Sequence, residues 1–160
     1  YKRQYQTYFP FGEDYTLVYN LDIGYADVYG DTLELPPFER YFVGGSRSVR
    51  GYESNSIGSQ RDSNGDPLGG DRKLVTNLEF VLPNPFSEKS KELRLSTFID
   101  GGFAWAPGDK LDLGDLRYSA GVALIWIAPV GIMRFSLAEP LNAEPGDETT
   151  SFQFTLGSMF

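Results

Sequence analysis

The sequence predicts an all-β protein, an antiparallel transmembrane β-barrel of which this chain supplies about seven strands. Three observations favour this fold class. Apolar and polar residues alternate along most of the chain, the connections between the alternating segments are in turn short and long, and aromatic residues make up 15 % of the sequence. A barrel in a bilayer needs this alternation because one face of each strand contacts lipid and the other faces a wet interior.

Seven segments have the two-residue period of strands and are bounded by turn-forming residues, whereas no segment keeps a helical period free of Gly and Pro. The expected strands are residues 1–9, 15–29, 72–83, 92–105, 115–127, 131–139 and 150–160. Each is long enough to span much of a bilayer, for which a tilted strand needs about 9–11 residues.

The connections between these strands alternate in length. Pro10–Asp14 and Ala128–Val130 are short, whereas Gly30–Asp71 is very long and contains the Ser-, Asn-, Asp- and Gly-rich run Ser54–Asp71. Outer-membrane barrels have short periplasmic turns and long external loops. The alternation therefore predicts that loop 30–71 is extracellular and that Phe160 lies at the periplasmic edge. A soluble β-sandwich is the alternative fold, but it gives no reason for such alternation.

Seven strands are too few to close a membrane barrel, and an open edge in hydrocarbon would leave backbone groups unpaired. We therefore expect residues 1–160 to be the C-terminal part of a barrel domain whose upstream strands are absent here. The lack of an initiating Met and of a signal peptide also indicates a mature fragment.

Composition excludes several functional classes. The chain has no Cys and no His, so thiol chemistry and the commonest general base are absent. The net charge of −8 and the pI near 4.5 argue against binding to nucleic acid, which needs a basic surface. No motif for nucleotide binding or nucleophilic catalysis is present. We expect neither an enzyme nor a protein with a cofactor or metal.

The two-residue period assigns side chains to the two faces of each strand. In the third strand Glu79 lies on the interior face, opposite Leu78 and Phe80. In the fourth strand Asp100 lies on the interior face with Phe98. Further outward positions in the later strands are Val122, Leu124, Trp126, Met133, Phe135 and Leu137.

Two tryptophans, Trp105 and Trp126, fall near strand ends, where aromatic girdles of membrane barrels lie. We therefore expect both at the membrane surface. Two acid pairs in the connections, Asp109/Asp112 and Glu144/Asp147, lack the spacing of a calcium loop, and we interpret each as a solvated loop.

Arg50 lies in the segment Arg40–Tyr52 of the long loop, which combines aromatic residues with glycines. Glu79 and Asp100 face the interior from adjacent strands, and the planar guanidinium of Arg50 can satisfy both carboxylates. Gly51 would permit a tight turn and Tyr52 would pack beside the guanidinium. The alternative is that Arg50 is solvated and that the two acids merely line a pore.

The motif Val49-Arg50-Gly51-Tyr52 resembles the VRGF/Y loop of the BamA family. The resemblance continues through residues 77–86, 98–102, 116–121 and 129–131. In that family the loop arginine docks inside the barrel on two acids, and the resemblance implies these roles for Arg50, Glu79 and Asp100. It also implies a barrel of about sixteen strands, preceded by periplasmic POTRA domains that this chain lacks. Tyr52 is a departure, because the family usually has Phe there.

The last strand alternates to the end of the chain and resembles the C-terminal signal of outer-membrane proteins. Gly157 weakens the strand interior and permits a kink there. In BamA-like proteins the seam between the last and first strands is the working part, which implies a role for the end of this chain. The predicted seam residues are Phe152, Phe154, Leu156, Gly157 and Phe160.

The resemblance implies a function in the outer membrane of a Gram-negative cell: the folding and insertion of other β-barrel proteins by strand addition at the seam. Its implied partners are outer-membrane lipid, nascent barrel proteins and, through the missing domains, accessory assembly lipoproteins. Two alternatives remain open at this point. One is a translocation pore of a related autotransporter-assembly or two-partner secretion system, and the other is a passive porin-like barrel.

Overall fold

The computed structural model describes residues 1–12, 14–27, 35–83, 92–129 and 131–157. These residues form one antiparallel sheet of seven strands in the order β1-β2-β3-β4-β5-β6-β7, so each strand pairs with its neighbours in the chain. The predicted all-β, antiparallel fold class is confirmed. The strands are β1 (Lys2–Phe11), β2 (Tyr15–Tyr25), β3 (Arg72–Leu82), β4 (Leu93–Trp105), β5 (Arg117–Ala128), β6 (Gly131–Pro140) and β7 (Phe152–Gly157).

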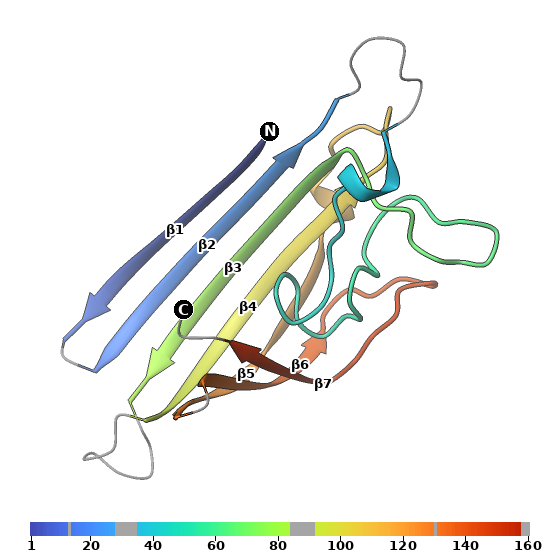
Figure 1. Cartoon of the computed structure of the whole chain (residues 1–160). Helices are drawn as coiled ribbons and strands as arrows, with labels where there is room; N and C mark the ends of the chain where they lie inside the picture. The colour runs from blue at the N-terminus through green and yellow to red at the C-terminus, as the bar shows by residue number, and fades with distance from the viewer. Residues whose placement is uncertain (13, 28–34, 84–91, 130, 158–160) are drawn as a thin grey trace.

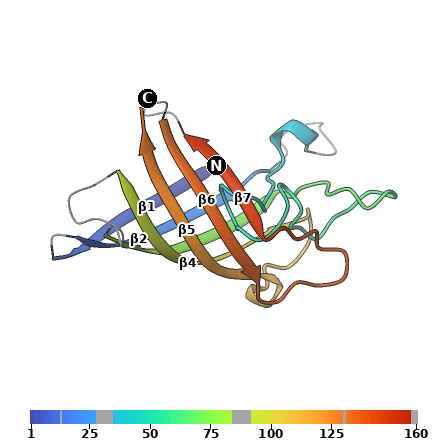
Figure 2. The ribbon, with the colours of Figure 1, turned by 90° about the horizontal axis from the view of Figure 1, so that it is seen from below.

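The sheet is strongly curved. In Figure 1 β1 to β4 run side by side along one diagonal, and in Figure 2 β5, β6 and β7 rise across that layer, so that the sheet encloses a concave side. Cumulative strand twist gives a large antiparallel sheet this shape. β1 and β7 are the outer strands of the described part. No helix among the described residues is long and apolar enough to cross a membrane.

The two faces of the sheet agree with the assignment made from the two-residue period. On β3, Glu79 is buried on the concave side while its neighbour Leu78 is exposed. On β4, Asp100 and Phe98 are buried and Ile99 between them is exposed. The register pairs Asp100 with Asn77, two residues from Glu79, so both carboxylates lie in adjacent rows of one surface.

Several strand boundaries differ from the predicted ones. β2 ends at Tyr25, and the predicted residues 28 and 29 lie outside the described residues. β5 begins at Arg117 because the chain first forms a 3-10 turn, η2 (Leu113–Asp115), in which the Asp112 side chain accepts the N–H of Gly114. β7 begins at Phe152, and residues 158–160 at its predicted end lie outside the described residues.

The prediction that Trp105 lies at the membrane surface is wrong. The side chain is 2 % exposed, and its indole N–H donates to Oδ2 of Asp115 at 2.9 Å. The connection between β4 and β5 covers this end of β4, and Trp105 packs edge-on against Phe103. Trp126 is exposed, as predicted.

The segment between β2 and β3 folds into the concave side of the sheet. We call its described part, residues 35–71, the inner loop; it includes the 3-10 turn η1 (Pro37–Glu39). Its apolar side chains form one buried cluster with residues of the wall: Val43, Val49, Tyr52, Ile57, Val75, Phe103, Ala104, Trp105 and Leu116. Burial of each large apolar side chain stabilises the folded state by about 1.5–3 kcal/mol. The cluster therefore holds the inner loop in one position against the wall.

Candidate functional site

Arg50 of the inner loop binds Asp100 of β4 in a bidentate pair. Its Nε donates to Oδ2 at 2.7 Å and its Nη2 donates to Oδ1 at 2.9 Å. The backbone N–H of Arg50 also donates to Oδ2, at 3.1 Å. The side chains are only 4 % and 0 % exposed. Parallel charge-assisted hydrogen bonds of this kind fix both the position and the orientation of the guanidinium.

Glu79 of β3 is the second carboxylate at the site, and the structure divides its contacts among three residues. Its Oε2 lies 3.5 Å from Nη1 of Arg50, an ion pair, and accepts a hydrogen bond from Nη1 of Arg134 on β6 at 3.0 Å. Its Oε1 accepts from the hydroxyl of Ser96 at 2.6 Å. Two guanidinium groups thus face two carboxylates. This balance matters because an unpaired charge in a buried place is costly.

The aromatic ring stacked on Arg50 belongs to Phe98, whose ring centroid lies 3.4 Å from the guanidinium carbon. Sequence reasoning gave that position to Tyr52. The Tyr52 hydroxyl instead donates to the carbonyl of Tyr118 on β5 at 3.3 Å. Phe98 was detectable in the sequence, since it shares the interior face of its strand with Asp100. Its ring excludes water from the pair and adds a cation–π attraction.

Gly51 makes the close approach of the loop to the wall possible. Its φ of +89° is a conformation that residues with a Cβ rarely adopt. A Cβ at this position would lie 3.2 Å from Cβ of Ala138 and 3.3 Å from Cβ of Ser119, so the wall leaves little room for one. Val49, on the other side of Arg50, is completely buried in the loop cluster.

Two amides of the wall hold the backbone of the loop on either side of Arg50. Nδ2 of Asn77 on β3 donates to the carbonyl of Ser48 at 2.6 Å, and Nε2 of Gln153 on β7 donates to the carbonyl of Tyr52 at 2.7 Å. Sequence reasoning missed both roles. The sequence did contain one signal for them: the two-residue period places each amide on the interior face of its strand.

The pKa of the Tyr52 phenol is raised from 10.0 to about 12, first by burial and second by the nearby Asp147 carboxylate, while Arg117 lowers it. Between pH 10 and 12 the phenol therefore keeps its proton in the folded protein and loses it in the unfolded one. The folded state binds more protons, so stability must fall as pH rises through this range.

We predict that Tyr52→Phe loses about 1 kcal/mol at pH 8, where the hydrogen bond to Tyr118 contributes. The difference should shrink or reverse at pH 11, because only the wild type is penalised by deprotonation of this phenol. Urea unfolding of the two complete proteins in lipid vesicles, followed by tryptophan fluorescence at both pH values, measures the effect. Equal losses of stability from pH 8 to pH 11 in both proteins would contradict it.

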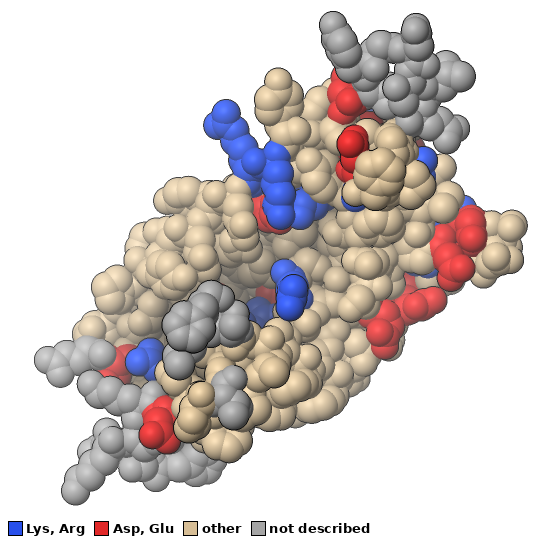
Figure 3. Space-filling model, in the orientation of Figure 1, with Lys and Arg blue, Asp and Glu red and all other residues tan. Residues whose placement is uncertain are grey.

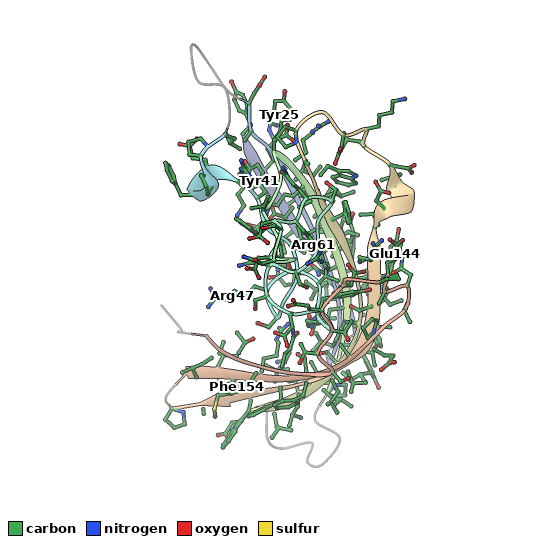
Figure 4. All side chains as sticks on the ribbon, turned by 90° about the vertical axis from the view of Figure 1, so that its right-hand side faces the viewer. Tyr25, Tyr41, Arg47, Arg61, Glu144 and Phe154 are labelled. Atoms are coloured by element: carbon green, nitrogen blue, oxygen red, sulfur yellow. The ribbon has the colours of Figure 1, made fainter. Side chains whose placement is uncertain are left out.

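A second charged cluster contains Glu144 and Asp147, the acid pair interpreted from the sequence as a solvated loop. For Asp147 that interpretation is wrong. Asp147 is not solvated: its side chain is 7 % exposed, and it accepts from Nε of Arg117 and lies 3.8 Å from Nη2 of Arg61. Glu144 is 64 % exposed and accepts from Nη2 of Arg117 at 2.7 Å. The cluster links the inner loop, β5 and the connection between β6 and β7. Figure 4 shows Arg61 and Glu144 among these loops.

The predicted seam residues are less enclosed. Phe152, Phe154 and Leu156 alternate with partly buried residues and are about half exposed on the outer face of β7. Gly157 pairs with Ile132 at the end of the strand. Phe160 lies outside the described residues. β7 is therefore a short outer strand of the described sheet, and its outward face is apolar, as a lipid-facing strand requires.

The concave side also holds an open hollow of about 510 Å³ beside Arg50. Arg47, Arg94 and Arg134 line it together with amide side chains of β1 to β3. Figure 3 shows basic side chains projecting over this face, with acidic ones mostly towards its rim, and Arg47 extends to the open side in Figure 4. In the described part of the chain no cluster of acidic side chains is placed to hold a metal ion.

Comparison with known proteins agrees with this architecture. The family model described as the Omp85 superfamily domain matches residues 1–160. The outer membrane protein assembly factor BamA of Neisseria meningitidis is 36 % identical over 96 % of this chain, which corresponds to 23 % of that protein. BamA of Nitratidesulfovibrio vulgaris is 33 % identical over 79 % of the chain and 16 % of its own length.

A crystal structure of BamA from Haemophilus ducreyi lacking POTRA domains 1–3 is similar to the fold, with a TM-score of 0.85 and 30 % sequence identity. The similarity covers 98 % of this chain and 34 % of that one. The chain thus spans about a sixth to a third of the length of these three relatives. The sheet described above accordingly matches part of the BamA barrel. The chain belongs to the Omp85 superfamily and is a BamA homologue, part of a β-barrel of the bacterial outer membrane.

Proposed function

We propose that this chain is the C-terminal part of a BamA-type barrel that folds other β-barrel proteins and inserts them into the outer membrane. The observation that carries the proposal is the similarity to two bacterial assembly factors, which includes the segment around Arg50 and its two acids. Neither bond-making nor a cofactor is part of this activity. Its substrates are nascent outer-membrane barrel proteins, and its surroundings are outer-membrane lipids.

The pairing of β7 supports strand addition as the mechanism. Within the described residues β7 pairs with β6 over six residue pairs, whereas each other strand interface has ten or eleven. A short outer strand is the place where an incoming strand can join with the smallest loss of existing hydrogen bonds. Backbone groups of the new strand are then satisfied before they reach hydrocarbon.

The docked loop has a structural role in this proposal. Arg50, bound to Asp100 and Glu79, joins the inner loop to β3 and β4, and Val49, Gly51 and Tyr52 seat it against the wall. A barrel whose seam opens has lost part of its continuous hydrogen bonding. An internal strut keeps the remaining wall in shape. Accessory assembly lipoproteins are further partners of the complete protein in this proposal.

Depletion of the complete protein from the bacterium that encodes it tests the proposal. The expected result is a loss of many unrelated barrel proteins from the outer membrane, with unfolded forms accumulating in the periplasm. Loss of a single secreted protein, with barrel proteins unchanged, would instead identify a translocation pore. A change in membrane conductance alone would identify a passive porin. Quantitative proteomics of outer-membrane fractions, combined with a secretion assay, separates the three outcomes.

A further inference from the structure

The interior face of the sheet carries two arginines with an isoleucine between them. Arg94 on β4 pairs with Ile125 on β5, and Ile125 pairs with Arg134 on β6. All three side chains line the open hollow beside Arg50, and we call them the basic row. Residues that pair directly across neighbouring strands have Cβ atoms about 4.5–5.5 Å apart. The two guanidinium groups therefore flank one apolar side chain on the same surface.

The positive charge of the basic row is only partly compensated. Arg134 donates to Oε2 of Glu79 at 3.0 Å, and the same oxygen forms the ion pair with Arg50. Arg94 is exposed and has neither a hydrogen bond nor an ion pair within the part of the chain that the structure describes. Among the described residues that line the hollow, Glu79 is the only carboxylate, against four arginines. An anionic group is therefore attracted to this place.

The rest of the lining suits a polypeptide better than a small anion. The hollow has a volume of about 510 Å³. Besides the arginines it is lined by aliphatic side chains of β2, β3, β5 and β6 and by amides of β1, β2 and β3: Val18, Val81, Ile125, Ile127, Ile132, Gln4, Gln6, Asn20 and Asn77. Apolar surface, amides and guanidinium groups together can bind the side chains, the backbone and the carboxylates of a peptide.

The hollow lies on the face that lipid does not contact, towards the end of the sheet with the short connections. Trp126, which follows the isoleucine of the basic row on β5, is exposed on the opposite face. Arg94 is close to the start of β4, and Ile127 and Ile132 lie beside the short connection between β5 and β6. Short connections are periplasmic in outer-membrane barrels. A chain that enters the interior from the periplasm therefore reaches the basic row before the docked loop.

The long connections of such a barrel lie outside the membrane, and one of them in this chain has the complementary charge. Residues 141–149, between β6 and β7, contain Glu144, Asp147 and Glu148 and no Lys or Arg. A segment of this kind cannot cross hydrocarbon, because its charges and backbone groups would be unpaired there. When a barrel protein is inserted, its long connections must still pass from the periplasm to the outside. The polar interior face of the sheet offers them a path.

We propose that the basic row binds acidic external connections of nascent barrel proteins while they pass through the interior from the periplasmic side. The proposal rests on the assembly function proposed above and adds a recognised feature of the substrate to it. Arg94, which has no partner in the described chain, forms the new ion pair, and Ile125 contacts apolar residues of the segment. Arg134 stays bound to Glu79 and contributes its charge. Exposed ion pairs are weak, so the segment is released again.

Photo-cross-linking in the complete protein, reconstituted in lipid vesicles, tests this proposal. A photoreactive amino acid replaces Ile125, and in a control protein it replaces Leu124, which lies on the outward face of the same strand and pairs with Phe135. The probe is a stalled barrel protein that carries residues 141–149 of this chain in an external connection. Cross-links to this segment are expected from position 125 and not from position 124.

A second probe removes the charge of the segment through Glu144→Gln, Asp147→Asn and Glu148→Gln. Its yield at position 125 should be lower by about tenfold, since several weak ion pairs are lost together. About 0.5 M NaCl should lower the yield of the acidic probe in the same direction, because salt screens exposed charges.

Arg94→Glu should also lower the yield of the acidic probe by about tenfold, because repulsion replaces attraction. Arg3→Glu is the matched control. Arg3 is exposed and pairs with the outward residue Ile23 on β2, so the same change of charge is made on the other face of the sheet. A third probe with Glu144→Lys and Glu148→Lys should restore cross-linking in the Arg94→Glu protein.

The outcomes separate the role of the basic row from the proposed function. Equal yields of the acidic and neutral probes would overturn the row and leave barrel assembly intact. The same holds if Arg94→Glu unfolds at much lower urea concentration than Arg3→Glu, since Arg94 would then be paired with another part of the barrel's own wall. If the wild-type protein fails to insert the unstalled barrel protein into the vesicles, the proposed function fails and the row with it. The comparison of the probes needs only the unchanged arginines, so it decides the matter even if Arg94→Glu does not fold.

Discussion

Replacement of Arg50 with alanine is expected to release the inner loop from the barrel wall and to abolish assembly of other barrel proteins. The change removes three of the contacts that neutralise Asp100 and Glu79, and it leaves Asp100 buried without its cation. Removal of one partner of a buried ion pair costs about 3–5 kcal/mol. Phe98 also loses the guanidinium that covers its ring.

Release of the loop can be measured in the complete protein with a cysteine at Val43, which is fully buried in the loop cluster and seven residues from Arg50. A membrane-impermeant thiol reagent should label this cysteine slowly in the otherwise wild-type protein. With Arg50→Ala the rate should rise by about 10²–10⁴, the factor that corresponds to the lost free energy.

Arg47→Ala is the matched control for this experiment. Arg47 lies on the same loop three residues earlier, but its side chain is exposed over the hollow. Its removal should leave labelling of the Val43 cysteine and the levels of other barrel proteins unchanged. If Arg50→Ala and Arg47→Ala behaved alike, the strut would not exist, and Arg50 would be one more cation lining the interior.

The two acids of the site are expected to contribute unequally. Asp100→Asn should cost about 3 kcal/mol, because the carboxylate accepts three hydrogen bonds from Arg50 and the amide would turn N–H groups towards donors. Glu79→Gln should cost about 1 kcal/mol. Its contact with Arg50 is a 3.5 Å ion pair without a hydrogen bond, and its other cation, Arg134, is about one-third exposed.

Urea unfolding in vesicles and labelling of the Val43 cysteine measure this order directly. A double-mutant cycle of Arg50→Ala with Asp100→Asn should show strong coupling, since each change removes the same interaction. The cycle of Arg50→Ala with Glu79→Gln should be closer to additive. An equal or larger effect of Glu79→Gln would mean that Glu79, and not Asp100, carries the docked loop.

Much of the fold was predictable from local features. A two-residue period assigned Glu79 and Asp100 to the interior face, since alternation along a strand depends only on backbone geometry. Strand ends were less predictable: Gly, Pro and Asp mark turns without fixing where pairing stops. Trp105 shows the limit, because aromatic residues near strand ends also suit a position beneath a connection, and only the position of η2 decides between the two.

The sequence by itself determined the sheet and the face of each strand, because these follow from local periodicity. The pairing of Arg50 with two acids was a prediction that the family resemblance implied. Only the tertiary structure decided which ring covers Arg50, how Glu79 divides its contacts with Arg134 and Ser96, and that the amide of Gln153 on β7 holds the loop backbone at Tyr52. Those contacts join residues up to 101 positions apart. They depend on the curvature of the whole sheet, which no local pattern encodes.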